Sequence, residues 1–147
     1  MFCVGHGDGY ITFAKQADLV TVRLYFDAVS RDIVAGFKIA QQRGWLSPDN
    51  RLLVDLRQFT GSVDWGAIRE LRALGPWIDD PAIRNVCAYI LEPGDMRRLL
   101  INVLAALYPV MRHRSFTEET AALTWLTEAA EAPHLSTEDR HLAFHTG

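Results

Sequence analysis

The sequence contains little that would fix a fold covalently or hold it in a bilayer. It has two cysteines, Cys3 and Cys87, and no pair of CxxC motifs. Neither a disulfide framework nor a structural zinc site is therefore expected. The most apolar stretch runs from Leu99 to Met111 and contains Asn102 and Pro109. It is shorter than the roughly 20 residues that cross a bilayer, so a membrane-spanning helix is not expected.

An excess of positive charge is also missing. The chain has 15 Lys and Arg against 18 Asp and Glu, a net charge of −3, which argues against nucleic acid as a partner. The first ten residues lack a basic segment followed by a long apolar core, so a signal peptide is not expected. These absences indicate a reduced, cytoplasmic protein, and peripheral association with a membrane surface stays open. With 147 residues, 49% of them hydrophobic, the chain can form one domain with a substantial core.

Turn residues and apolar periodicity divide the chain into alternating strands and helices. Strand-like runs occupy residues 9–16, 19–26, 51–56, 83–93 and 111–116. Helical spacing follows Ser30, Asp64, Asp95 and Thr117, four residue types that can cap a helix. A hairpin followed by alternating helices and strands predicts an α/β fold, with a mixed five-stranded sheet and four helices. We assign residues 1–133 to one domain and 134–147 to a polar tail.

Two local motifs stand within this order of elements. The first, VDLRQFTGSVDW, is a strand, loop and helix start that contains Asp55, Phe59, Gly61 and Trp65. The second, RSFTEETAALTWL, leads into a helix and contains Arg114, Phe116, Ala122, Trp125 and Leu126. Together they resemble the SpoIIAA-like family of the STAS superfamily, which includes bacterial anti-sigma-factor antagonists and the cytoplasmic domains of some anion transporters. The resemblance implies a SpoIIAA-like fold and a non-catalytic binding or regulatory module.

The resemblance also draws attention to the loop before the second helix. In anti-sigma-factor antagonists this loop carries an Asp-Ser-Ser-Gly element in which one serine is phosphorylated. If Gly66 takes the place of that glycine, Asp64 and Trp65 occupy the two serine positions. Neither side chain has a hydroxyl group, whereas Thr60 and Ser62 lie nearby at shifted positions. Because phosphorylation acts by adding charge at one defined place, we predict that the scaffold is present without the switch. An anti-sigma-antagonist-like interaction module controlled in another way remains an alternative.

The predicted helix from Asp95 to Tyr108 is more apolar than one buried face requires. Its apolar residues cover a wide arc and include Met96, Leu99, Leu100, Ile101, Val103, Leu104 and Leu107. The outer side must meet an apolar ligand, a membrane surface, a protein partner or a second copy of the chain, unless the tail covers it with Leu142 and Phe144. Two arginines near the helix start suit an anionic headgroup. We predict as ligand-binding residues Arg97, Arg98, Leu100, Leu104, Tyr108 and Trp65.

Catalytic residues are the weakest candidates. His113 with Asp55 or Glu92 would make a small enzyme that uses carboxylates at strand ends, where open sheets bind ligands. No nucleophile elbow or ordered triad accompanies them, so we do not expect enzyme activity.

The remaining patterns predict no cofactor. Glu138, His141 and His145 could share one helix face, but no fourth metal ligand is apparent. The glycines of GHGDG precede a strand, whereas a phosphate-binding loop opens a helix. We expect a flexible N-terminal lead there, and neither a metal nor an organic cofactor.

Overall fold

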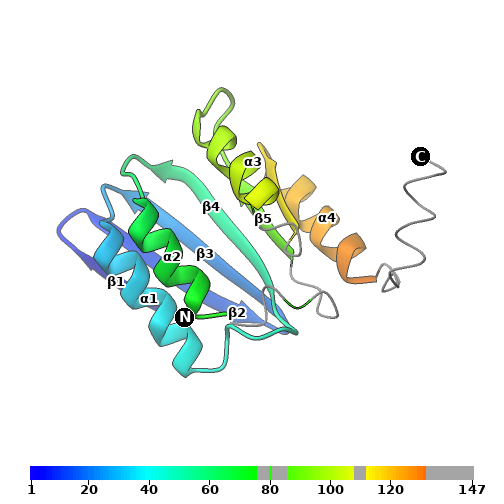
Figure 1. Ribbon diagram of the computed structural model, residues 1–147, viewed down its shortest axis with the longest axis horizontal. Helices are drawn as coiled ribbons and strands as arrows, with labels where there is room; N and C mark the ends of the chain where they lie inside the picture. Colours follow the sequence, from blue (N-terminus) through cyan, green and yellow to red (C-terminus); the bar gives the residue numbers. More distant parts are fainter. Residues whose placement is uncertain (76–79, 81–85, 108–111, 132–147) are drawn as a thin grey trace.

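The computed structural model describes residues 1–75, 80, 86–107 and 112–131. Its described strands form one sheet in the order β1-β2-β3-β4-β5-β6 (Figure 1). The strands are β1 (Phe2–His6), β2 (Gly9–Gln16), β3 (Leu19–Phe26), β4 (Arg51–Phe59), β5 (Val86–Ile90) and β6 (Arg112–Phe116). The helices are α1 (Ser30–Gln42), α2 (Trp65–Ala73), α3 (Arg97–Leu107) and α4 (Glu119–Glu131). The first three strands are antiparallel and β3 to β6 are parallel, which confirms the predicted mixed α/β architecture.

The sheet has six strands, so the prediction of five was wrong. The expected flexible lead is β1, which pairs with β2 from Phe2 opposite Phe13 to His6 opposite Gly9. Gly7 and Asp8 form the two-residue connection, and Gly7 has a φ of +63°, a conformation that glycine adopts without steric cost. Gly-Asp between two strand-like runs is itself a hairpin signal. The glycines therefore make a turn between two strands.

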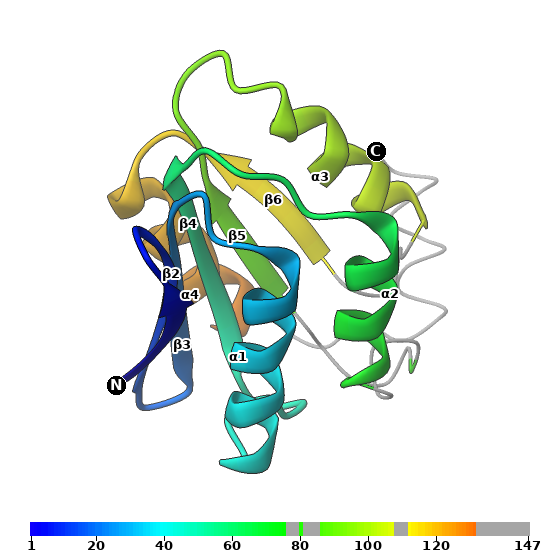
Figure 2. The same cartoon turned by 90° about the vertical axis from the view of Figure 1, so that its left-hand side faces the viewer.

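Alternation along each strand separates the helices into two layers (Figure 2). On the front face, α1 packs on β1 and β2. Gly36 of α1 lies so close to Phe13 of β2 that a Cβ atom would stand 2.5 Å from the Phe13 ring. On the back face, α4 buries Trp125 and Leu126 against Leu53 and Ile90. The core is thus split into a front cluster and a back cluster by the sheet.

The helix starts agree with the predicted caps at two positions. Asp64 accepts a hydrogen bond from the backbone N–H of Ala67 at 2.7 Å, and Asp95 accepts one from Arg97 at 2.9 Å. The prediction for Ser30 was wrong. Val29 precedes α1 without a side-chain cap, and the Ser30 hydroxyl donates instead to the carbonyl oxygen of Ser62 at 3.5 Å. Ser30 thereby joins α1 to the loop before α2.

Trp125 tests the packing of α4. Its ring is 9% exposed, contacts the Phe116 ring at 5.7 Å between centroids and lies under the Arg112 guanidinium. Trp125→Ala should lower the free energy of unfolding by about 3–5 kcal/mol through lost burial and a cavity. Thr124→Ala, one residue away and exposed, should change it by less than about 0.5 kcal/mol. Urea denaturation measures both, and equal losses would contradict the packing described here.

Candidate ligand-binding cavity

The front face of the sheet is unevenly covered. Helix α1 packs on β1, β2 and α2, whereas α3 packs on β6. Among the described residues, no Cα atom of α2 lies within 8 Å of one in α3, and neither helix comes that close to β4 or β5. Figure 1 shows α2 beside α1 on one side of β4, and α3 on the other side. The front-facing side chains of β4 and β5 therefore meet a space between two helices.

This space is a cavity of about 530 Å³, within the range of small-molecule sites. Its floor consists of Leu52, Val54 and Leu56 from β4 together with side chains of β5. Its walls come from α1, α2 and α3 and include Ile33, Phe37, Ile68, Leu71, Leu100, Ile101 and Leu104. The surface is overwhelmingly apolar. A ligand enclosed there would be bound mainly by burial of its apolar atoms.

Charges in the cavity wall have one sign. Three arginines line it, Arg51, Arg72 and Arg97, and no Asp or Glu does so among the described lining residues. Arg51 is paired with Asp18 at 2.7 Å, so its charge is locally balanced. The cavity of an acidic protein thus carries basic side chains, which favours an occupant with a negative end.

Arg97 stands where α3 begins and is held by several contacts. Its Nε donates to both carboxylate oxygens of Asp95 at 3.1 Å, and its Nη2 donates to the carbonyl oxygen of Phe59 at 2.6 Å. The guanidinium also lies 5.0 Å from the Phe59 ring centroid. Hydrogen bonds from Arg97 hold the pKa of Asp95 below its ordinary value. The third nitrogen, Nη1, is buried and has no hydrogen-bond partner among the described residues.

A second polar group lies on the strands at the cavity floor. His113 of β6 stands opposite Cys87 of β5 in the register, and its Nδ1 lies 2.9 Å from the Tyr89 hydroxyl. Burial lowers the pKa of His113 to about 4, so the ring is neutral at pH 7. Burial also raises the pKa of Cys87 to about 12 and raises that of Tyr89. The other ring nitrogen of His113, Nε2, is buried and has no hydrogen-bond partner within the described part of the chain.

The structure brings three of the predicted ligand residues together. Arg97, Leu100 and Leu104 line the cavity. Arg98 is exposed and outside the lining, and Trp65, 49% exposed at the start of α2, is also outside it. Tyr108 lies outside the described residues, as do Leu142 and Phe144.

The predicted wide apolar arc of α3 has two sides. Leu100, Ile101 and Leu104 face the cavity. Met96, Leu99 and Val103 are 73%, 56% and 43% exposed and form what we call the outer face of α3. The arc is wide because one side meets the cavity and the other meets the surface.

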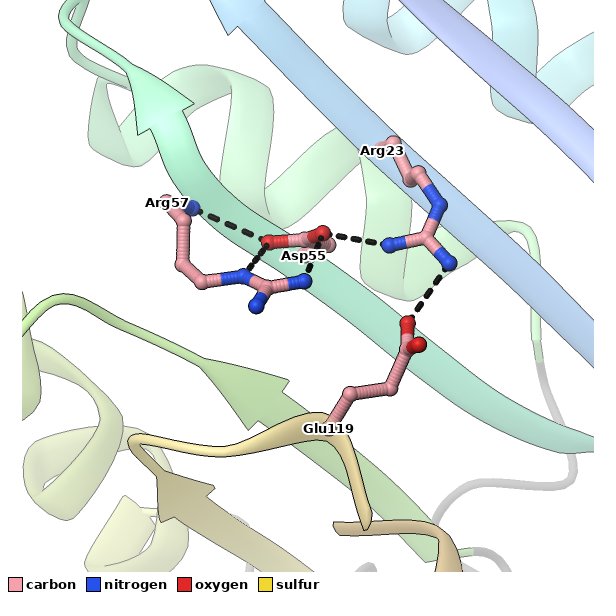
Figure 3. A network of polar contacts seen from close by, with 4 residues as sticks. All are labelled: Arg23, Asp55, Arg57 and Glu119. Carbon is pink, nitrogen blue, oxygen red and sulfur yellow. Dashed lines mark hydrogen bonds and ion pairs between the residues drawn. The ribbon is translucent and has the colours of Figure 1, made fainter.

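Asp55 does not line the cavity. It is 7% exposed and lies on the back face, in a network with Arg23, Arg57 and Glu119 (Figure 3). Arg57 donates to Asp55 through Nε at 3.0 Å and Nη2 at 2.9 Å. Burial raises the pKa of Asp55, but hydrogen bonds from Arg57 and Arg23 outweigh it and hold the pKa below its ordinary value. Asp55 is a structural anion that joins β3 and β4, and Glu119 links this network to α4.

The three residues of the enzyme alternative therefore do not lie together in one site. Asp55 faces the back of the sheet, whereas His113 faces the cavity. Glu92 is exposed in the loop after β5 and does not line the cavity among the described residues. Alternating strand residues point to opposite faces, so residues near one end of a sheet need not meet.

Other candidates add no chemistry. Within the described ranges, no group of three or more His, Cys, Asp or Glu could hold a metal ion, and no helix is long and apolar enough to span a membrane. Glu138, His141 and His145 lie outside those ranges. Both cysteines are free.

The loop before α2 keeps Asp64 as a helix cap, while Thr60 and Ser62 are exposed. Asp64 thus uses its carboxylate on the backbone of α2.

Residues on β5 are the part of the site that the sequence analysis missed. Cys87 and Tyr89 both line the cavity, but their segment VCAYIL appears in the sequence as an ordinary buried strand. Two residues apart on one strand, they must share a face. Their partner His113 depends on the register between β5 and β6, for which the sequence carries no local signal.

The fold is similar to known structures. No protein-family model and no curated protein sequence match the chain. A DUF3478-family protein with a SpoIIAA-like fold from Shewanella loihica PV-4 superposes with a TM-score of 0.57 at 17% identity, over 79% of this chain and 91% of that one. Phosphorylated SpoIIAA, a Bacillus cell-fate determinant, gives 0.44 at 17% identity, over 79% and 98%. The first similarity confirms the predicted SpoIIAA-like fold.

The neutral buried state of His113 predicts a pH dependence of stability. The folded pKa is depressed from 6.5 to about 4, so below pH 6.5 the unfolded chain binds a proton that the folded protein does not. Stability should fall by about 2–3 kcal/mol between these two values. Asp18, Asp55 and Asp95, whose lowered pKa values start from 3.8, contribute their loss at more acidic pH.

His113→Gln is the matched variant for this measurement, because it retains hydrogen-bonding capacity toward Tyr89 and cannot titrate. Urea denaturation at intervals from about pH 7 to about pH 4 should show a smaller loss for the variant than for the wild type. Parallel curves for the two proteins would mean that His113 is not held neutral by burial.

Proposed function

We propose that this protein of SpoIIAA-like fold is a non-catalytic binding module whose cavity holds an elongated apolar ligand. One observation supports this above all: the front of β4 and β5 faces a cavity of about 530 Å³ between α2 and α3. Mostly apolar clefts of this size are typical of small-molecule sites, and a large apolar surface that is left uncovered usually marks a binding site. An occupant therefore explains this space better than imperfect packing does.

Leu100 and Leu99 offer a matched pair of positions for testing the proposal. They are neighbours on α3, but Leu100 lines the cavity and Leu99 is exposed. Leu100→Trp should fill part of the space that a ligand needs and weaken binding at least about tenfold, equivalent to about 1.4 kcal/mol. Leu99→Trp adds the same side chain outside the cavity and should leave binding unchanged.

Binding is measured by displacement of the fluorescent amphiphile anilinonaphthalene sulfonate, and native mass spectrometry of the wild type reports any ligand retained from expression. Equal binding by the two variants would place the ligand elsewhere. Absence of any apolar ligand or probe binding by the wild type would refute the proposed function.

A second candidate function is association with a partner surface, supported by the outer face of α3. Its three exposed apolar residues are accompanied by exposed Arg98, and each basic residue near an anionic membrane contributes about 1 kcal/mol. Salt-sensitive co-sedimentation with anionic vesicles, abolished by Arg98→Glu, would support a membrane surface. Salt-resistant dimers in light scattering, dissociated by Leu99→Asp, would support a second copy. A monomer that ignores vesicles would remove this candidate.

A further inference from the structure

Nη1 of Arg97 and Nε2 of His113 are both buried in the cavity wall, and neither has a hydrogen-bond partner among the described residues. Both residues line the same cavity. Buried polar atoms in native proteins almost always have partners, so two unmatched atoms in one apolar cavity point to groups that an occupant supplies.

The register and the contact of Arg97 with β4 place these two residues toward opposite ends of the cavity. Arg97 bonds to the carbonyl oxygen of Phe59, the last residue of β4. His113 stands opposite Cys87, which in turn pairs with Leu52 near the beginning of β4. The stretch from Leu52 to Phe59 spans seven residue steps, roughly 23 Å at 3.3 Å per step. Apolar side chains of β4 occupy the floor between the two ends, so the occupant is a long apolar chain with a polar group at each end.

The Arg97 end requires a hydrogen-bond acceptor, because a guanidinium nitrogen can only donate. The basic side chains of the wall favour a negative acceptor. Asp95 already offsets part of the Arg97 charge at 2.8 Å, which suits a singly charged carboxylate better than a doubly charged phosphate. A carboxylate would receive a charge-assisted hydrogen bond from Nη1.

The His113 end has a different requirement. The ring is neutral, and its Nδ1 is engaged by the Tyr89 hydroxyl. If Tyr89 donates to Nδ1, Nε2 carries the hydrogen and donates; in the other tautomer Nε2 accepts. A hydroxyl group serves in both cases because it can donate and accept. A carboxylate or a cation fits only one of them.

We propose that the cavity binds a long-chain hydroxy carboxylic acid, with its carboxylate at Arg97 and its hydroxyl group near the far end of the chain at His113. This inference rests on the proposed function and adds to it the chemical class and the orientation of the ligand. Arg97 is then the headgroup residue, and His113 is the residue that distinguishes a hydroxylated chain from a plain one.

Four ligands of matched length test the proposal on the unmodified protein: hexadecanoic acid, its methyl ester, ω-hydroxyhexadecanoic acid and hexadecyl phosphate. Displacement of anilinonaphthalene sulfonate gives their relative affinities. The hydroxy acid should bind about tenfold more tightly than the plain acid, and the acid about tenfold more tightly than its ester, since each lost hydrogen bond leaves a buried group unmatched. Tighter binding of the phosphate than of the acid would overturn the assignment of the headgroup.

Variants at the two ends assign each preference to its residue. His113→Phe should remove the preference for the hydroxy acid and leave the affinity for the plain acid unchanged, whereas His113→Gln should retain part of the preference. Arg97→Gln should remove the preference for acid over ester, and Arg98→Gln, at the exposed neighbour, should not.

The ligand experiment distinguishes a failure of the proposed function from a failure of the proposed ligand class. Equal binding of all four ligands, with blocking by Leu100→Trp, would keep the proposed function and overturn the assignment of the two ends. No binding of any of the four would overturn both. Because the four ligands are compared on the wild type, their order of affinity does not depend on whether a variant folds.

Discussion

Alternate side chains of β4 face opposite sides of the sheet, and this alternation determines which residues line the cavity and which pack under α4. Leu52, Val54 and Leu56 point to the front, where they form the cavity floor. Leu53 points to the back, where it packs in the cluster under α4, and Asp55 follows it on the same face. Because β4 is flanked by parallel partners on both sides, its backbone hydrogen bonds are used within the sheet. A shift of one residue would move the buried carboxylate into the apolar floor, so the register is strongly specified.

The two faces of the sheet differ in how completely their charged side chains are paired. On the back, the carboxylate of Asp55 is matched by Arg23 and Arg57, and Glu119 matches the remaining side of Arg23 (Figure 3). Each charge in that network has a partner, and the buried member, Asp55, is held by two arginines. Such a hydrogen-bonded network helps to specify one arrangement of the neighbouring elements. On the front face, Arg97 uses Nε and Nη2 in its contacts with Asp95 and Phe59. Its buried Nη1 has no hydrogen-bond partner among the described residues. This difference supports the proposal that the front face, and not the back face, binds a ligand.

Local patterns predicted most elements, and the failures have physical causes. Asp64, Asp95 and the apolar arc of α3 were recognised because capping and helical spacing are encoded within a few residues. The sixth strand was missed because the composition of GHGDG suggests a loop, although its Gly-Asp pair is a hairpin turn. Asp55 was offered as a partner for His113 because Asp55 and Glu92 were both expected near the carboxyl ends of neighbouring strands. The opposite faces of Asp55 and His113 follow from the registers of β4 and of β6, and register between distant strands is not a local property. The cavity depends on two helices that do not meet, which no single segment can encode.

Tyr89 and His113 place polar groups in the cavity floor, where packing alone would not require them. Two apolar residues of similar size would fill these positions, and they would not leave a ring nitrogen buried without a partner. An unmatched buried polar group destabilises the folded protein when the cavity is empty. A ligand that supplies the missing partner removes this cost only in the bound state, and it stabilises the fold in proportion to the logarithm of its concentration. The same argument applies to Arg97 at the other end. In the proposed complex, a cavity that is apolar along its length and unmatched at both ends would select ligands by the spacing of their polar groups, and burial of the chain between them would supply most of the affinity.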